Sequence, residues 1–125
     1  MVWNNNTTIK NAINSVLSQT YKNIEYIIID GGSTDGSVEV IEKYRDKISV
    51  FLSESDKGIY DALNKGIDLS TGEVITILHS DDLFYDNSVV SDMMNRVSET
   101  NAEICFSDMV IVDSSLKKVL RYYMS

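Results

Sequence analysis

The fold is decided by residues 26–36, which read Tyr-Ile-Ile-Ile-Asp-Gly-Gly-Ser-Thr-Asp-Gly. The unbroken apolar run over 26–29 indicates a strand that is buried on both faces, as the strands of parallel sheets are. Asp30 ends that run, and the glycines and helix-capping residues that follow indicate a sharp turn into a helix. We therefore predict a strand, a turn and a helix in direct succession, with an acid at the carboxyl end of the strand.

The same alternation extends along the rest of the chain. Apolar runs over 48–52 and 74–78 predict two further buried strands. Apolar residues at helical spacing predict helices over residues 9–17, 38–44, 59–67 and 89–97. Strands that alternate with helices predict an α/β fold of the Rossmann-like kind, with a mostly parallel, twisted sheet and helices on both faces. Beyond residue 102, apolar runs on either side of Asp113-Ser114-Ser115 predict a hairpin.

Composition narrows the class of protein. The 125 residues are 43% hydrophobic and 24% charged, which suits a single soluble globular domain over 1–125. A net charge of −8 disfavours binding to nucleic acid, because that binding needs clustered Lys and Arg. No apolar run approaches the roughly 20 residues of a membrane helix, and the first residues lack a secretory signal, so we expect a cytoplasmic protein. Cys105 is the single cysteine and is expected to be a buried structural thiol.

Acidic and basic residues follow each predicted strand, where ligands of parallel sheets gather. Asp81 and Asp82 come directly after the run over 74–78, and such hard oxygen ligands suit Mg²⁺ or Mn²⁺. A cation there would let this acidic edge bind a diphosphate. The alternative interpretation is that the two acids merely cap the next turn.

The other two strand ends are open to similar alternatives. Lys57 begins a predicted helix whose amides could meet an anion, or it is a solvated surface charge. The turn after Asp30 is either a ligand site or an ordinary connection, and it lacks the spacing of phosphate-binding and dinucleotide-binding loops. His79 is the single histidine, and we interpret it as a packed residue and not a catalytic base.

Taken in order, these motifs resemble glycosyltransferase family two, the inverting enzymes with the GT-A fold. The matching stretches cover nearly the whole chain and include residues 3–21, residues 27–36, Glu-Ser-Asp-Lys-Gly-Ile-Tyr-Asp-Ala-Leu-Asn-Lys-Gly over 54–66, and Ser80-Asp81-Asp82. The resemblance implies that Asp30 contacts the base, often uracil, that Asp81 approaches the ribose, and that Asp82 ligates the metal. It also implies that Asn4 and Lys57 border the nucleotide.

Some positions depart from the family pattern. Gly31 stands where the common form has a second acid, and Ser80 replaces the first acid of an Asp-x-Asp motif, so metal ligation would depend on Asp82. The family's first strand normally precedes Asn4. We expect residues 1–3 to keep a stub of that central strand, with a segment of another copy in the rest of its place, or else a marginally folded chain. The resemblance places the acceptor-binding segment and the catalytic base beyond Ser125, so the catalytic residue is unassigned.

The function that follows by resemblance is transfer of a sugar from a nucleotide-diphosphate donor, with a UDP-sugar expected, to an acceptor hydroxyl with inversion. The enzyme would be a hexosyl- or N-acetylhexosaminyltransferase that uses a carbohydrate or lipid-linked acceptor, in cell-envelope polysaccharide synthesis at the inner face of a membrane. We expect the chain alone to be inactive in transfer. The alternatives are a non-catalytic nucleotide-binding module and a nucleotidyltransferase-like enzyme, although the latter would need an early basic phosphate loop that is absent.

Overall fold

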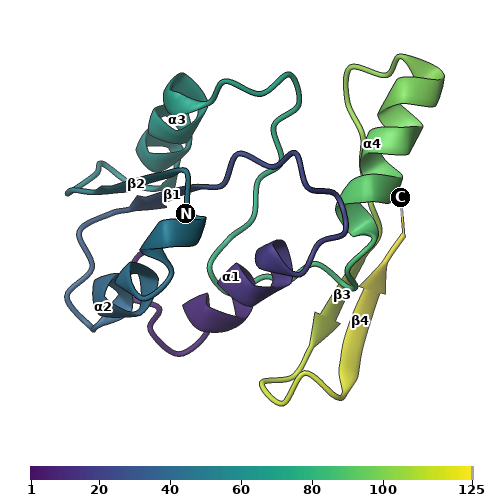
Figure 1. The fold of residues 1–125 in the computed structure, drawn as a ribbon. Coiled ribbons are helices and arrows are strands. Elements are labelled where there is room, and N and C mark those ends of the chain that lie inside the picture. Colours follow the sequence, from purple (N-terminus) through teal and green to yellow (C-terminus); the bar gives the residue numbers. More distant parts are fainter. Residues whose placement is uncertain (125) are drawn as a thin grey trace. The chain divides into compact units, whose positions relative to one another are not determined.

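The computed structural model describes residues 1–124, which belong to two compact units, Met1–Ser91 and Asp92–Ser125 (Figure 1). The first unit holds α1 (Ile9–Leu17), β1 (Ile27–Asp30), α2 (Ser37–Glu42), the short 3₁₀ helix η1 (Arg45–Lys47), β2 (Val50–Ser53) and α3 (Ile59–Leu69). Helix α4 (Val89–Thr100) runs from the first unit into the second, which also holds β3 (Met109–Val112) and β4 (Val119–Tyr123).

The centre of the first unit is a parallel pair of strands with helices on both faces. β1 and β2 pair in register from Ile27 opposite Val50 to Asp30 opposite Ser53. Consecutive side chains of a strand face opposite sides. Ile28 accordingly joins the core cluster with residues of α1 and α2, while Ile29 lies against Gly66 of α3. Figure 1 shows α1 and α2 on one side of the two strands and α3 on the other. This arrangement confirms the predicted α/β fold and the predicted strands at 26–29 and 48–52, with small shifts at their ends.

Helix α1 supplies much of the core. Its apolar residues recur every three or four positions, so they form one stripe. Those that are fully buried are Ile9, Ala12, Ile13 and Val16. Ile9, Ala12 and Ile13 of this set form one core cluster with Ile28 of β1, Ile41 of α2, Ile48 and Val2. Burying an aliphatic side chain of this size stabilises the fold by about 1.5–3 kcal/mol, so this cluster anchors α1 and α2 on one face of the strands.

The first residues keep a stub of strand beside β1. The backbone N–H of Val2 donates to the carbonyl of Ile29 at 2.9 Å, and the N–H of Gly31 donates to the carbonyl of Val2 at 2.9 Å. These bonds form one parallel bridge, between Val2 and Asp30. The amine of Met1 donates to the carbonyl of Leu78 at 3.1 Å. The stub expected at residues 1–3 is therefore confirmed, and it lies between β1 and the residues near Leu78.

The strand predicted over 74–78 is wrong, because this segment has no strand assignment. Its side chains are also more exposed than expected, with Val74, Ile75 and Ile77 at 42%, 49% and 50%. A strand is defined by its ladder of hydrogen bonds to a neighbour. The stub contributes one hydrogen bond to this segment, at Leu78. Apolar composition alone could not reveal that the ladder is missing.

The second unit contains the predicted hairpin. β3 and β4 are antiparallel, with Met109 opposite Tyr123 and an irregularity between Ile111 and Val112. The turn is closed by the N–H of Asp113, which donates to the carbonyl of Lys118 at 2.9 Å. Cys105 is half-exposed, so the expected buried thiol is not observed. Across residues 1–124, no helix combines the length and the apolar character that crossing a membrane requires.

Candidate functional site

The loops that follow β1 and β2 lie against each other at the carboxyl ends of the two strands. The hydroxyl of Ser53 donates to a carboxylate oxygen of Asp30 at 2.7 Å, and the N–H of Glu54 donates to the carbonyl of Asp30 at 3.0 Å. A Cβ placed on Gly32 would lie 3.4 Å from the backbone of Ser55. Gly32 also has a φ of 84°, which favours glycine. The sequence around 30–32 therefore serves close approach of two loops.

Asp30 is completely buried, with 0% exposure. Its Oδ2 accepts hydrogen bonds from the N–H of Gly32 at 3.1 Å, the N–H of Ser33 at 3.0 Å and the hydroxyl of Ser53. Its Oδ1 accepts the hydroxyl of Ser33. A carboxylate offers about four acceptor positions, and the chain's own donors use that number. Asp30, which the sequence analysis places at the nucleotide, thus stabilises the turn after β1 in this structure.

Asn4 clamps the same turn from the N-terminal segment. Its N–H donates to the hydroxyl of Ser33 and its Oδ1 accepts the N–H of Thr34, both at 2.8 Å. Asn4 adopts a left-handed backbone with a φ of 47°, a conformation that Asn tolerates better than most residues. The structure thus places Asn4 against the turn after β1, and its predicted role beside the nucleotide stays a prediction.

Residues close behind Asn4 tie a third loop to this edge. The side-chain amide of Asn5 donates to the hydroxyl of Ser80 at 2.9 Å, and the hydroxyl of Thr8 donates to the carbonyl of Ser80 at 2.8 Å. Ser80 is buried at 8% exposure. The backbone of Asn5 is also fixed, because its N–H donates to the hydroxyl of Ser37 at 2.9 Å. Segment 4–8 thus joins the loops at 33–37 and 79–82.

Asp35 secures the start of α2 against this segment. Its carboxylate accepts the hydroxyl of Ser37 at 2.6 Å, the N–H of Ser37 at 3.0 Å and the N–H of Asn6 at 2.9 Å. The bond from the Ser37 hydroxyl contributes most to holding the pKa of Asp35 below its ordinary value. The N-cap of α2 is Gly36 and not one of the predicted Ser-Thr-Asp residues, although Asp35 directly before it accepts the first N–H of the helix, from Ser37.

Asp81 and Asp82 follow Ser80 and are both exposed. The N–H of Asp82 donates to the carbonyl of His79 at 3.2 Å, so the two acids begin a turn while their carboxylates face solvent. Within residues 1–124, no three His, Cys, Asp or Glu side chains form a cluster able to hold a metal ion. The donor set still fits a hard divalent ion that retains waters and takes substrate phosphates as ligands, as Mg²⁺ typically does.

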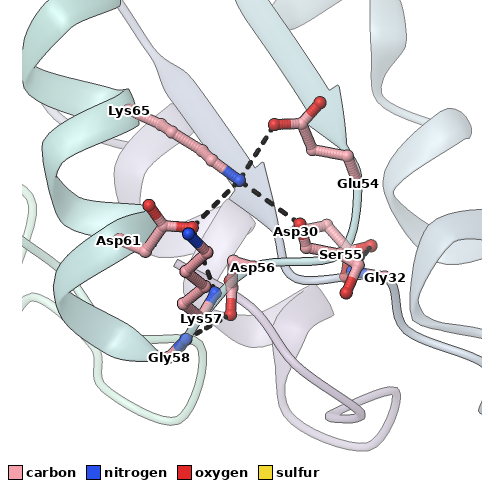
Figure 2. Close-up of polar contacts among 9 residues, drawn as sticks. All are labelled: Asp30, Gly32, Glu54, Ser55, Asp56, Lys57, Gly58, Asp61 and Lys65. Carbon is pink, nitrogen blue, oxygen red and sulfur yellow. Dashed lines mark hydrogen bonds and ion pairs between the residues drawn. The ribbon is translucent and has the colours of Figure 1, made fainter.

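Lys57 is exposed in the loop just before α3, next to a network of charges that the sequence did not reveal (Figure 2). The ammonium of Lys65 lies 2.9 Å from a carboxylate oxygen of Glu54 and 3.3 Å from one of Asp61. Asp61 also accepts the backbone N–H of Lys57 at 3.0 Å, which is the largest cause of its lowered pKa. Glu54 contributes most to the raised pKa of Lys65. This network fixes the loop after β2 to the first turn of α3.

Solved structures with the same architecture are glycosyltransferases, and the fold is of the GT-A type. The structure of Staphylococcus aureus TarS residues 1–349 in complex with UDP matches 90% of this chain and 35% of its own, with a TM-score of 0.80 and 23% identity. The mannosyltransferase PcManGT of Pyrobaculum calidifontis, solved with GDP-Man and Mn²⁺, matches 89% of this chain and 33% of its own, with a TM-score of 0.68 and 20% identity. These likenesses establish the fold.

The family follows from the sequence comparison: the chain belongs to glycosyl transferase family 2, whose model matches residues 1–123. It is 32% identical over 117 residues to the glycosyltransferase GlyG of Streptococcus pneumoniae. The aligned region covers 91% of this chain and 38% of GlyG. It is 41% identical over 107 residues to an uncharacterized glycosyltransferase of Rickettsia conorii. That aligned region covers 82% of this chain and 18% of the relative. The chain thus spans well under half the length of either relative.

Proposed function

We propose that the protein binds a nucleoside-diphosphate sugar at the edge formed by the loops at 30–37, 53–58 and 79–82, for transfer of the sugar to an acceptor hydroxyl with inversion. The observation that carries this proposal is the convergence of these loops. Segment 4–8 joins the loops at 33–37 and 79–82, and Asp30 joins the loop at 53–58 through the hydroxyl of Ser53. Ligands of parallel α/β sheets bind beyond this end of the strands. Support also comes from the TarS structures with UDP and UDP-GlcNAc. We take a UDP-sugar as the donor.

In this proposal each predicted residue has a role that its position permits. Asp82 holds Mg²⁺ or Mn²⁺, and Asp81 faces the ribose. The exposed ammonium of Lys57 neutralises anionic charge, while Asp30 and Asn4 act through the turn that they hold in place. When bound, the divalent ion supplies charge stabilisation to the departing diphosphate. The Mn²⁺ in the mannosyltransferase structure supports this assignment by analogy of fold.

The acceptor and the setting of the reaction are proposed from the family alone. We propose a carbohydrate or lipid-linked acceptor, a hexosyl or N-acetylhexosaminyl donor group, and a role in cell-envelope polysaccharide synthesis at the inner face of a membrane. The general base would deprotonate the acceptor hydroxyl. No residue of this chain is assigned to that step.

Calorimetry with UDP, GDP, CDP and ADP, each with and without Mn²⁺, tests the proposed function. We expect UDP binding that Mn²⁺ strengthens, and we expect Asp82→Ala to weaken binding in Mn²⁺ by at least about tenfold, because even outer-shell changes at metal sites cost that much. The variant should unfold within about 0.5 kcal/mol of the parent protein, since Asp82 is exposed.

Asp68→Ala is the matched control. Asp68 is an exposed acid near the end of α3, and its substitution removes the same charge as Asp82→Ala does. It should leave UDP affinity unchanged. Equal affinity of the Asp82 variant and the parent protein in Mn²⁺ would remove Asp82 from the metal site. Absence of binding to every nucleotide would overturn the proposed function itself.

A further inference from the structure

We propose that Gln19 is a positioning residue for the acidic loop, which we define as residues 80–86 with Asp81 and Asp82. Gln19 follows the end of α1 and touches neither acid, so it acts through the backbone of the loop. This inference rests on the proposed function, because it takes Asp82 as the ligand of the divalent ion. Gln19 has no role in the site predicted from the sequence.

The acidic loop needs support from outside its own chain segment. Residues 74–78 lead into it, but they have no strand assignment, so no ladder fixes the direction in which the loop begins. The side chains of Asp81 and Asp82 are themselves exposed. A metal site, however, needs its ligands within about 0.5 Å of their places. Other parts of the first unit must therefore hold the loop.

Helix α1 provides that support near both of its ends. Thr8, the N-cap of α1, donates its hydroxyl to the carbonyl of Ser80 at 2.8 Å, where the loop begins. Farther along the helix, the hydroxyl of Ser15 accepts the N–H of Phe84 at 3.4 Å. The loop thus runs beside α1, and each of these contacts joins residues at least 69 positions apart in the sequence.

Gln19 fixes the far end of the loop. Its side chain is buried at 1% exposure. Its Nε2 donates to the carbonyl of Asp86 at 2.7 Å and to that of Ser15 at 3.0 Å, while its Oε1 accepts the N–H of Val90 at 3.0 Å. An amide has both donors and an acceptor, which these backbone groups require. One buried side chain therefore joins the residues on both sides of 87–89 to the end of α1.

Loss of these bonds should act on the metal site without removing a ligand. Asp82 would keep its carboxylate, but the backbone that carries it would sample more positions. Metal binding would then have to order the loop, and ordering costs conformational entropy. Groups that orient metal ligands typically change the affinity for the metal by about 10- to 100-fold.

The Mn²⁺ enhancement, defined as the ratio of UDP affinity with Mn²⁺ to that without it, measures this role by calorimetry. Gln19→Met keeps a flexible side chain of similar length but removes both bonds to the loop. We expect the enhancement to fall by about tenfold. In the Asp82→Ala protein the same substitution should leave the remaining enhancement unchanged, because the ligand that Gln19 positions is already absent.

Two further variants separate positioning from a loss of stability. Ile41→Val is the control, because it removes a methylene from the core of the first unit and destabilises the fold while leaving the hydrogen bonds of the loop in place. It should keep the enhancement of the parent protein. Thr8→Val removes the bond to Ser80 at the other end of the loop, and the Thr8 hydroxyl makes no capping bond to α1. It should lower the enhancement even if Gln19→Met fails to fold.

The outcomes distinguish this inference from the proposed function. An unchanged enhancement in Gln19→Met and Thr8→Val, with Asp82→Ala still impaired, would overturn the positioning role and leave the proposed function standing. An equal loss from Gln19→Met in the parent and in the Asp82→Ala protein would do the same, because the effect would not pass through Asp82. If the parent protein bound none of the four nucleotides, the proposed function and this inference would fall together.

Discussion

A buried carboxylate at the end of β1 organises the residues around it. Asp30 accepts two backbone N–H groups and two hydroxyls, from Gly32, Ser33 and Ser53. A buried donor left without its acceptor costs about 1–3 kcal/mol. Asp30 therefore contributes to the stability of the turn as well as to the geometry of any ligand that the turn contacts.

Substitution of Asp30 tests both contributions. We expect Asp30→Ala to lower the free energy of unfolding by about 3 kcal/mol or more, because several donors lose their acceptor. UDP affinity should fall to a similar extent with and without Mn²⁺, since the turn is not a metal ligand. Chemical denaturation and calorimetry measure the two effects. A loss of affinity confined to Mn²⁺-containing buffer would contradict this role, and an unchanged unfolding midpoint would contradict the stabilising one.

At the scale of the element, a network of ion pairs joins the first turns of α3 to the loop after β2. Lys65 pairs with Asp61 one turn earlier in α3 and with Glu54 in the loop after β2. Asp61 in turn accepts the N–H of Lys57, just before the helix begins. Exposed ion pairs contribute little singly, so the stabilising effect depends on the network and on the hydrogen bond to the backbone.

The lowered pKa of Asp61 predicts a definite pH dependence. A group whose pKa is lower in the folded state stabilises it above the ordinary value of 3.8, and this contribution is lost as the pH falls through the lowered pKa. The raised pKa of Lys65 has the opposite sign, so its contribution is present below 10.5 and is lost as the pH rises through the raised value.

Thermal unfolding across pH checks this prediction. Asp61→Asn should melt at a lower temperature than the parent protein at neutral pH, and the difference should shrink as the pH falls below 3.8. Asp68→Asn, on the same helix, should show no such change. A constant difference between Asp61→Asn and the parent protein down to strongly acidic pH would mean that Asp61 acts through packing and not through its charge.

At the scale of the whole molecule, β1 forms a ladder with β2 on one side, while among residues 1–124 its other side forms a single bridge, to the stub at Val2; we call this largely unpaired side the gap. The stub forms one bridge to β1 on one side and one bond to Leu78 on the other. The apolar side chains of Val74, Ile75 and Ile77 remain partly exposed. Backbone groups and apolar surface are thus available to a further extended segment.

An added apolar strand should use that gap. We expect an N-terminal extension of about four β-branched residues to raise the melting temperature by about 4 °C or more, because each net hydrogen bond contributes about 1 kcal/mol before apolar burial is counted. A Gly-Ser extension of equal length is the control and should have no effect. We also expect the unextended protein to associate and the extended one to elute as a monomer. Equal stability and a monomeric state of both would place the gap elsewhere.

Local chemistry allowed much of this protein to be predicted from its sequence. Periodicity and turn residues within short windows predicted the strand near 26–29, the turn after Asp30, helices α1 and α3, and the hairpin of β3 and β4. The family follows from the order of its motifs. These features are set by neighbours in sequence, because helix and strand periodicities act over only a few residues.

The remaining features depend on contacts between segments that lie far apart in the chain. The run at 74–78 has the composition of a buried strand, but a ladder requires a partner strand, and composition does not reveal whether that partner is present. Asp30 reads as an available acid, yet Ser53, 23 positions away, occupies one of its oxygens. In the sequence, Gly31 stands where the family pattern has a second acid, and the structure shows that the carboxylate of Asp56 lies against it. Tertiary packing alone determines which donors and which atoms share the space at a strand end.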